Sequence, residues 1–456
     1  MGTLLNTRVS TDRSALLYRL SHVFNSSLDL DEVLNRVIDE MIGATRAESG
    51  FLALKQKDGR LDFPVARGID RKTIDDPQSK VTLDVILKVV EEGRSILISD
   101  ATGYVHMRDF NQPDDFGMVS IMCAPLVVRE NVIGAVYLEN CVHAGAFTEE
   151  DLEMLDTISV SAAIAVDNAR LFEEAIVKSR MEQELQVARN VQRDFLPRVI
   201  SQPLNWEISA HLEAAREVGG DFYDVISLDN DRLVGLVIGD VCDKGVASAL
   251  FMALFRSLIR AFAEQHMCSD GRFSTIHTEE IDIPQLSDLK IDNSSIDVNT
   301  LINTVYLTNQ YINNHHQASN MFTTLFFAII DPATGRMGYV NCGHEPPIIL
   351  NPKGIKARLN PTGPVLGIFP DMRFQVNQVS LAPGDTLLAY TDGAIDALNT
   401  EGEPFSEERL LSLAQSPVES TDELLKKITL DLQAHMSTQP QYDDLALLAV
   451  RWIRES

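Results

Sequence analysis

One stretch of the chain, residues 165–196, contains neither glycine nor proline, and it limits the possible architectures more than any other segment. Apolar residues recur along it at steps of three or four, which is the spacing of one helical face. These residues are Val177, Met181, Leu185, Ala188, Val191 and Phe195. Pro197 and Pro203 follow and end the pattern, because a residue before proline avoids helical backbone angles. The pattern predicts one long linker helix over residues 165–197, with a separate folding pattern on each side.

A single apolar stripe on a long, otherwise charged helix needs a partner. The stripe either packs against the chain's own domains or forms a short coiled coil that joins two subunits. Lys178 and Gln192 interrupt a strict heptad. Between these two readings we favour the coiled coil, and we therefore expect a homodimer.

Length and charge exclude several classes of protein. A chain of 456 residues is too long for one hydrophobic core and suggests two to four domains. The net charge of -27 argues against binding to nucleic acid or to an anionic membrane surface, since both need basic residues. The five cysteines are scattered without a CxxC spacing, which indicates free thiols in a reducing compartment. Neither a signal peptide nor an apolar run near the ~18 residues of a membrane span is apparent, so we expect a cytoplasmic protein with no membrane partner.

The segment before the linker helix alternates short strand patterns with helical ones. We expect residues 14–42 to be helical with a break near residues 25–27. We also expect strands at 49–54, 62–65 and 95–99, a helix at 81–91, and a hairpin of strands 119–128 and 132–138. A further helix opens at Thr148, the expected N-cap, with Asp151 as the matching acid of a capping box. This order predicts one α/β domain.

Four runs of this segment resemble a GAF domain. They are GFLALKQKDGRLDFPVARG, EEGRSILISDA, SIMCAPLVVRENVIGAVYLEN and FTEEDLEMLDTISVSAAIAVDNARLFE. The resemblance covers residues 12–172 and implies a sensor domain with a central antiparallel sheet, through which the homodimer would also form. The ligand stays unknown: nothing points to a cyclic nucleotide, and there is no Cys-His pair for a bilin. Cys123 is interpreted as a small core residue.

The segment after the linker helix carries a second α/β pattern, which we assign to residues 198–456. We expect strands at 232–238, 321–330, 337–340, 347–350, 386–390 and 445–452, and helices at 247–262, 299–314, 406–413 and 421–435. So many strands, accompanied by helices in pairs, predict a sandwich of two sheets covered by helices. Residues 266–298 are polar and acidic without periodicity, and we expect an exposed, partly disordered insertion there.

Acidic residues of this segment stand where the expected strands begin or end. They are Asp221, Asp240, Asp392, Asp443 and Asp444. One such acid is ordinarily a turn or cap residue, but several at equivalent positions indicate a shared site. Carboxylates cannot crowd together ionised without compensation. No His or Cys cluster with zinc spacing accompanies them, so the oxygen ligands favour Mg²⁺ or Mn²⁺.

Seven ordered motifs make residues 183–456 resemble the bacterial SpoIIE-like and RsbU-like phosphatases of the metal-dependent, type 2C class. They are AAREVGGDFYDV, VIGDVCDKGVASALFMAL, MFTTLFFAIID, NCGHEPPIIL, GPVLGIF, LLAYTDGAIDALN and YDDLALLAV. Upstream, ELQVARNVQRDFLP resembles the helix that precedes this domain in many members. The resemblance implies an α-β-β-α sandwich with a dinuclear metal centre at one end.

The resemblance also implies a role for each acid. Asp240 would bridge two Mn²⁺ or Mg²⁺ ions, and Asp392 and Asp443 would complete one metal site. Asp221 and the backbone carbonyl of Val241 would serve the other. The two cations would lower the pKa of a water molecule that attacks phosphorus, so no nucleophilic Cys or Ser is required.

Other residues near the motifs keep alternative interpretations. Asp444 would orient a water molecule. Arg216 would contact the substrate phosphate or else form a surface salt bridge, and His344 would stabilise a turn or act as a catalytic acid. Cys242 is interpreted as structural.

The chain departs from the family pattern at two positions. Asp243 stands where many relatives have glycine, and Ala446 where they often have threonine. An acid at position 243 would alter metal affinity or else face solvent. Neither departure removes an expected ligand, so activity is expected.

The resemblance implies a phosphoserine or phosphothreonine protein phosphatase controlled by its sensor domain. Its substrate would be a phosphorylated STAS-type anti-anti-sigma factor in a partner-switching pathway. We expect ligand binding by the sensor to reposition the linker helix against the helices that flank the insertion. One alternative is a catalytically weak, phosphatase-like regulator that binds a partner. Another is a two-metal hydrolase acting on a nucleotide, although no phosphate-binding P-loop supports it.

Overall fold

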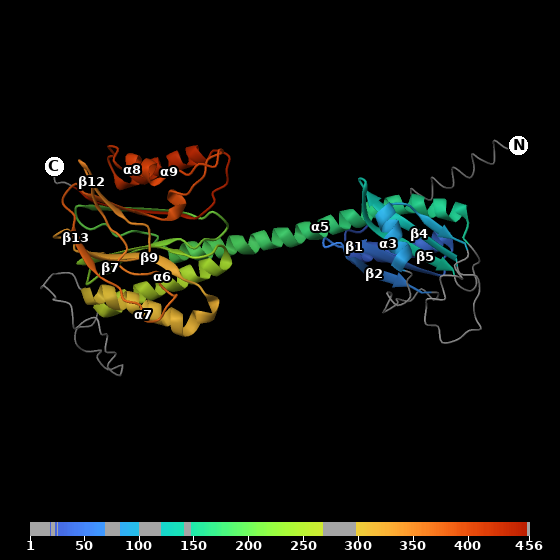
Figure 1. Cartoon of the computed structure of the whole chain (residues 1–456), viewed down its shortest axis with the longest axis horizontal. Helices are drawn as coiled ribbons and strands as arrows, with labels where there is room; N and C mark the ends of the chain where they lie inside the picture. The colour runs from blue at the N-terminus through green and yellow to red at the C-terminus, as the bar shows by residue number, and fades with distance from the viewer. Residues whose placement is uncertain are drawn as a thin grey trace. The chain divides into compact units, whose positions relative to one another are not determined.

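The computed structural model describes Arg19 and residues 23–24, 26–68, 83–99, 120–140, 147–267 and 298–453 (Figure 1). The chain divides between Glu182 and Gln183 into two units, which are described separately. The expected insertion 266–298 lies almost wholly outside the described residues, as do Cys141 and Cys268.

The first unit is built on a five-stranded antiparallel sheet in the order β2-β1-β5-β4-β3. Its strands are β1 (Ser49–Lys55), β2 (Leu61–Arg67), β3 (Ile96–Ile98), β4 (Ser120–Val128) and β5 (Asn131–Asn140). Between β4 and β5, Arg129 and Glu130 have φ angles of 47° and 73°. Positive φ at both central residues is the mark of a two-residue type I′ turn, so the predicted hairpin is confirmed.

Helices cover both faces of this sheet. On one face, α2 (Leu30–Thr45) and the start of α5 (Glu149–Phe195) pack through Val37 and Ile158 against strand residues such as Leu138. On the other face, α3 (Leu83–Glu92) packs beside Tyr137 and Cys123. Cys123 is fully buried, as a core interpretation requires.

The long helix α5 begins with the predicted cap. The Asp151 backbone N–H donates to Thr148 Oγ1 at 3.3 Å, and the Thr148 N–H donates to Asp151 Oδ2 at 2.9 Å. These reciprocal bonds satisfy donors that a helix start leaves free, so the capping box is confirmed. The helix expected over residues 165–197 is the C-terminal part of α5.

The second unit contains two five-stranded sheets, in the orders β13-β10-β9-β8-β7 and β12-β11-β14-β15-β6. The strands are β6 (Trp206–Glu213), β7 (Phe222–Leu228), β8 (Leu233–Val241), β9 (Thr323–Ile330), β10 (Arg336–Cys342), β11 (Ile348–Asn351), β12 (Gly354–Arg358), β13 (Asn377–Ser380), β14 (Thr386–Tyr390) and β15 (Leu445–Trp452). Short 3-10 turns η1 (Gln317–Ser319) and η2 (Asp392–Ala394), the end of α5 and the helices named in the next paragraph complete the described part of the unit.

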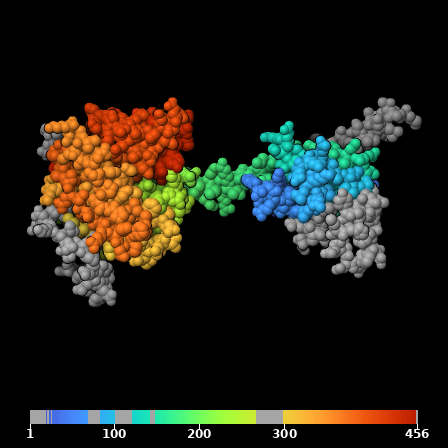
Figure 2. Space-filling view, viewed as in Figure 1, coloured from blue at the N-terminus to red at the C-terminus, as the bar shows by residue number. Residues whose placement is uncertain are grey.

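The two sheets pack face to face. Leu236 and Phe326 of the first sheet share a core with Leu387 and Leu448 of the second. The helices α6 (Val246–Met267) and α7 (Val298–His316) bury the outer face of the first sheet, and α8 (Glu407–Ala414) and α9 (Thr421–Met436) bury that of the second. Figure 1 shows the two helix pairs on opposite sides of the strands, and in Figure 2 α8 and α9 form a red layer over the unit. This is the expected α-β-β-α sandwich.

Four strands of the second unit were not predicted from the sequence. They are β6, β7, β12 and β13, and each forms an edge of its sheet. Although five of the seven residues of β7 are buried, an edge strand has a neighbour on one side only and can carry fewer apolar residues than a central strand. The burial pattern of β13 shows this, because none of its four residues is buried.

Within the described part of the chain, Val246–Gln265 of α6 is long and apolar enough by composition to cross a membrane. The expectation that no segment approaches this composition is therefore too strong. Met252, Phe255, Ile259 and Ala263 of this helix are fully buried in the core against the first sheet, which gives its apolar character a structural reason.

Candidate metal centre

The five acids predicted from the sequence meet in the second unit. Asp240 lies at the end of β8, and Asp392 opens η2 directly after β14. Asp443 and Asp444 precede β15, and Asp221 precedes β7. β8 and β14 belong to different sheets, so the sandwich itself brings the acids together. When protonated, the Asp221 carboxyl donates a hydrogen bond to Asp240, and Asp240 lies within electrostatic range of the other three carboxylates.

The carboxylates raise one another's pKa. Burial, followed by the charge of Asp392, raises the pKa of Asp240 to about 7. Burial and then the charge of Asp240 raise the pKa of Asp221 well above its usual range. Asp392 follows the same direction, through burial and then Asp443. A cation bound among such acids would stabilise their ionised forms and offset the repulsion between them.

The segment that carries Asp221 is held by Asp444. Asp444 Oδ1 accepts a hydrogen bond from the Ala215 backbone N–H at 2.8 Å, and Oδ2 accepts one from that of Gly220 at 2.6 Å. Its carboxylate therefore faces backbone amides of the 215–221 loop. Burial raises the pKa of Asp444.

The glycine before Asp221 is required by close packing. A Cβ on Gly220 would lie 2.2 Å from Ser248 Oγ and 2.6 Å from the Val241 carbonyl oxygen. That oxygen, predicted to bind a metal, accepts a hydrogen bond from Ser248 Oγ at 3.1 Å. Only glycine lets the Asp221 segment approach β8 this closely.

Thr391 connects two parts of the site. Its hydroxyl donates to Asp221 Oδ2 at 2.6 Å and accepts from the Ala446 backbone N–H at 2.9 Å. Ala446 is fully buried, so the alanine that departs from the family pattern supplies a backbone donor rather than a side chain.

The acids fit a divalent metal by charge and by donor type, since Asp221 and Asp444 are buried, the other three are half-buried, and all five are carboxylates that repel one another. Among the described residues, however, no group of three or more His, Cys, Asp and Glu side chains is arranged so that it could hold a metal ion by itself. The acids therefore lie near one another without forming a complete set of metal ligands, and their roles as ligands remain predictions.

The remaining predicted residues have distinct surroundings. Arg216 is exposed on the loop before Asp221 and forms none of the ion pairs found among the described residues. Asp243 is exposed, with a φ of 70°, which accounts for the glycine of many relatives at this position. Cys242 Sγ accepts a hydrogen bond from the Phe322 N–H at 3.2 Å, in keeping with a structural role.

His344 is buried and does not suit proton transfer at neutral pH. Burial lowers its pKa to about 4, and Nδ1 lies 2.9 Å from Thr324 Oγ1. The turn around it is closed by Asn341, whose side chain bonds both the N–H and the carbonyl of His344. These contacts favour the turn-stabilising interpretation.

Sequence reasoning missed two polar residues of this region. Lys244 Nζ pairs with Asp443 Oδ2 at 2.9 Å, and Gln192 of α5 bonds the backbone of Gly219. Lys244 stands inside the quoted GDVCDKG motif, so its position was a usable signal. Gln192 interrupts the apolar heptad of its helix, and that interruption was the signal available in the sequence.

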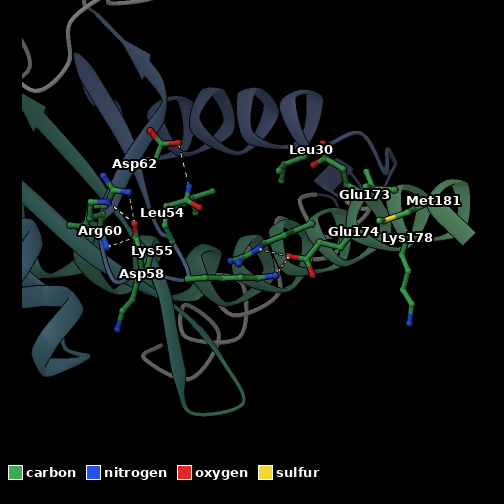
Figure 3. Close-up of a pocket in the computed structure, with 15 residues that line it drawn as sticks. Leu30, Leu54, Lys55, Asp58, Arg60, Asp62, Glu173, Glu174, Lys178 and Met181 are labelled. Carbon is green, nitrogen blue, oxygen red and sulfur yellow. Dashed lines mark hydrogen bonds and ion pairs between the residues drawn. The ribbon is translucent and has the colours of Figure 1, made fainter. Parts of the chain in front are cut away.

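The first unit holds a separate groove of about 1260 Å³ beside the β1–β2 hairpin and α5 (Figure 3). Basic and acidic side chains line it together: Lys57 pairs with Glu174 at 3.2 Å, and Arg60 with Asp58 at 2.6 Å. Leu54 and Met181 add apolar surface. This mixed lining favours no single ligand charge.

Comparisons with known proteins agree with this architecture. Residues 27–167 match the family described as "GAF domain", and residues 230–453 match "Stage II sporulation protein E (SpoIIE)". Protein IcfG of Synechocystis sp. is 39% identical over 267 residues, which are 59% of this chain and 41% of that protein. Phosphoserine phosphatase RsbP of Bacillus subtilis is 26% identical over 60% of this chain and 59% of its own length.

The chain thus spans less than two thirds of the length of both relatives. Among solved structures, the SiaA-PP2C domain of Pseudomonas aeruginosa aligns with a TM-score of 0.47 and 18% identity, over 61% of this chain and 99% of that domain. The two family matches fall on the two units in the order expected from the motifs. The chain therefore consists of a GAF domain followed by a SpoIIE-type domain of the PPM phosphatase class.

Proposed function

We propose that the chain is a metal-dependent protein phosphatase that removes phosphate from phosphoserine or phosphothreonine. The observation that carries the proposal is the group of buried and half-buried carboxylates in which burial, followed by mutual repulsion, raises the pKa of Asp221, Asp240 and Asp392. The name "phosphoserine phosphatase" of the relative RsbP supports the substrate class.

Two Mn²⁺ or Mg²⁺ ions would be held by Asp221, Asp240, Asp392, Asp443 and the Val241 carbonyl. When bound, they supply Lewis acidity, which lowers the pKa of water and offsets charge on phosphoryl oxygens. The chain's own groups keep the ligands in place: Thr391 donates to Asp221, and Asp444 holds the loop before it. Arg216 is exposed close to Asp221 in sequence and would bind the substrate phosphate.

We further propose a phosphorylated STAS-type protein as substrate, in a cytoplasmic partner-switching pathway. Each round of hydrolysis would return the substrate to its unphosphorylated form. The GAF domain would control this activity through an unknown ligand. In the proposed domain division, residues 12–172 form the sensor, 165–197 the linker helix and 198–456 the phosphatase.

The homodimer belongs to the same proposal, through the linker helix and the GAF domain. Val177, Met181 and Val191 of the stripe on α5 each leave more than half of their surface exposed. An apolar stripe of this kind is covered well by a second copy of the same helix. Replacing Met181 and Val191 by serine should convert the dimer to a monomer in sedimentation experiments, whereas serine at the exposed, non-stripe Ala175 should not.

The phosphatase proposal is tested by Mn²⁺-dependent hydrolysis of a phosphoserine protein. Wild type should turn over, while Asp240→Asn and Asp392→Asn should lose at least about 100-fold in rate, because they remove charges that hold the cations. Asp229→Asn, in the turn between β7 and β8 where the side chain pairs with Arg232, is a matched control and should retain activity. A folded wild type that binds the phosphoprotein without hydrolysing it would favour the catalytically weak regulator instead.

A further inference from the structure

The last part of α5 contacts the loop that carries Asp221. Gln192 Nε2 donates to the Gly219 carbonyl oxygen at 2.6 Å, and the Gly219 N–H donates to Gln192 Oε1 at 3.2 Å. One side-chain amide therefore satisfies both backbone groups of a single residue. Gln192 and Gly219 both belong to the second unit.

Gly219 cannot move far without disturbing the site. A Cβ on Gly219 would lie 2.3 Å from Asp444 Oδ2, so the backbone is pressed against that carboxylate. The next residue, Gly220, donates to Asp444 and also accepts a 3.4 Å hydrogen bond from the Val241 N–H through its carbonyl. A shift of Gly219 would be transmitted to Asp221 on one side and to Val241 on the other.

The helix end that presents Gln192 is itself anchored. Four residues along, Leu196 packs against the core between the first sheet and its helices. The side chain of Gln192 is half-buried, whereas Gln186 on the same helix is exposed and reaches only Asn190. The contact with the Gly219 backbone is therefore specific to Gln192 and is not made by Gln186 of the same helix.

We propose that Gln192 is a positioning residue of the metal centre. Its amide holds the Gly219–Gly220 backbone so that the Asp221 carboxylate and the Val241 carbonyl face the same cation. This inference rests on the proposed function, since it assigns Gln192 a task in the same site. It also gives the end of the linker helix a direct hydrogen-bonded connection to that site.

The test compares Gln192→Leu, which keeps the size of the side chain and removes both hydrogen bonds, with Gln186→Leu as a matched control. Mn²⁺ affinity of the full chain is measured by titration calorimetry. Amide exchange of the peptide that covers residues 218–223 is measured by mass spectrometry. Gln192→Leu should weaken Mn²⁺ binding about 10-fold, the loss typical of two net hydrogen bonds, and should speed exchange in this peptide.

Gln186→Leu should change neither quantity. Affinity within twofold of wild type, together with unchanged exchange at residues 218–223, would overturn the inference even when the phosphatase proposal stands. The proposed function fails separately, if Asp240→Asn binds Mn²⁺ as tightly as wild type. The exchange comparison still decides the role of Gln192 in that case, because it requires neither metal nor substrate.

Discussion

Lys244 Nζ lies 2.9 Å from Asp443 Oδ2 and 2.7 Å from the Tyr442 carbonyl oxygen, so an ammonium group is held against a candidate metal ligand. The same ammonium lies 4.0 Å from the centre of the Tyr442 ring. These contacts fix the lysine at the edge of the carboxylate group, where its charge opposes that of an incoming cation.

Lys244→Met should therefore strengthen divalent cation binding. Removing a positive charge beside Asp443 lowers the repulsion felt by Mn²⁺, and we expect roughly a 3- to 10-fold tighter affinity in a calorimetric titration at low salt. Lys353→Met, on an exposed turn, is the control and should have no effect. Weaker Mn²⁺ binding by Lys244→Met would show that the lysine supports the ligand set instead.

Removing the Asp240 charge should stabilise the metal-free protein at neutral pH. The folded state holds the pKa of Asp240 at about 7, above its ordinary value of 3.8, so the folded protein binds more protons between these values. The contribution of Asp240 to the free energy of unfolding is then greatest below about pH 4 and is lost as pH rises through about 7, by on the order of 3 kcal/mol.

Asp240→Asn should reduce this loss of stability at high pH. Part of the loss should remain, because the pKa values of Asp221 and Asp392 are also raised in the folded protein. Urea unfolding of metal-free protein at pH 5 and pH 8 measures the difference. Adding Mn²⁺ should restore the stability of wild type at pH 8 and have little effect on the variant. Equal pH dependence in both proteins would contradict the account.

Gly220→Ala should disrupt the site by sterics. The new Cβ would meet Ser248 Oγ at 2.2 Å and the Val241 carbonyl at 2.6 Å, so the Asp221 loop must withdraw. We expect a loss of about 1–3 kcal/mol in stability and of most Mn²⁺ affinity. Adding Ser248→Ala should rescue only in part, because the contact with the Val241 backbone remains.

Gly43→Ala provides the contrasting control for this steric argument. It lies in α2, and its Cβ would meet nothing within 4 Å. Alanine in a helix should be neutral or stabilising by up to about 1 kcal/mol. Thermal unfolding and Mn²⁺ titration of both glycine variants separate local crowding from a general effect of substitution.

Asp224 joins α6 to β7 through a buried ion-pair network. Its side chain is 1% exposed and pairs with Arg256 at 3.0 Å and with Arg260 at 2.7 Å. Asp224→Ala leaves Arg256 without its acid and Arg260 with Glu264 alone, and it should destabilise the second unit by about 3–5 kcal/mol in urea unfolding. The exposed pair Asp422–Lys426 is the control: Asp422→Ala should cost at most about 1 kcal/mol.

The sequence predicted the central strands and helices well because their apolar periodicity is strong. β14 and β15 have the predicted bounds, and α9 differs from its prediction by one residue. The missed strands β6, β7, β12 and β13 are all edge strands, where one-sided pairing permits polar residues. Their assignment as strands depends on hydrogen bonds to a neighbouring strand. The local sequence of a strand does not show such hydrogen bonds.

The sequence alone determined which acids stand at strand ends, that the chain has two α/β patterns, and that one helix joins them. Only the tertiary structure decided which groups surround those acids. Lys244 beside Asp443, Thr391 beside Asp221 and Gln192 on Gly219 join residues separated by 199, 170 and 27 positions. Such contacts depend on how the sheets and helices pack, and packing is set by the shape of the whole core rather than by any local run of residues.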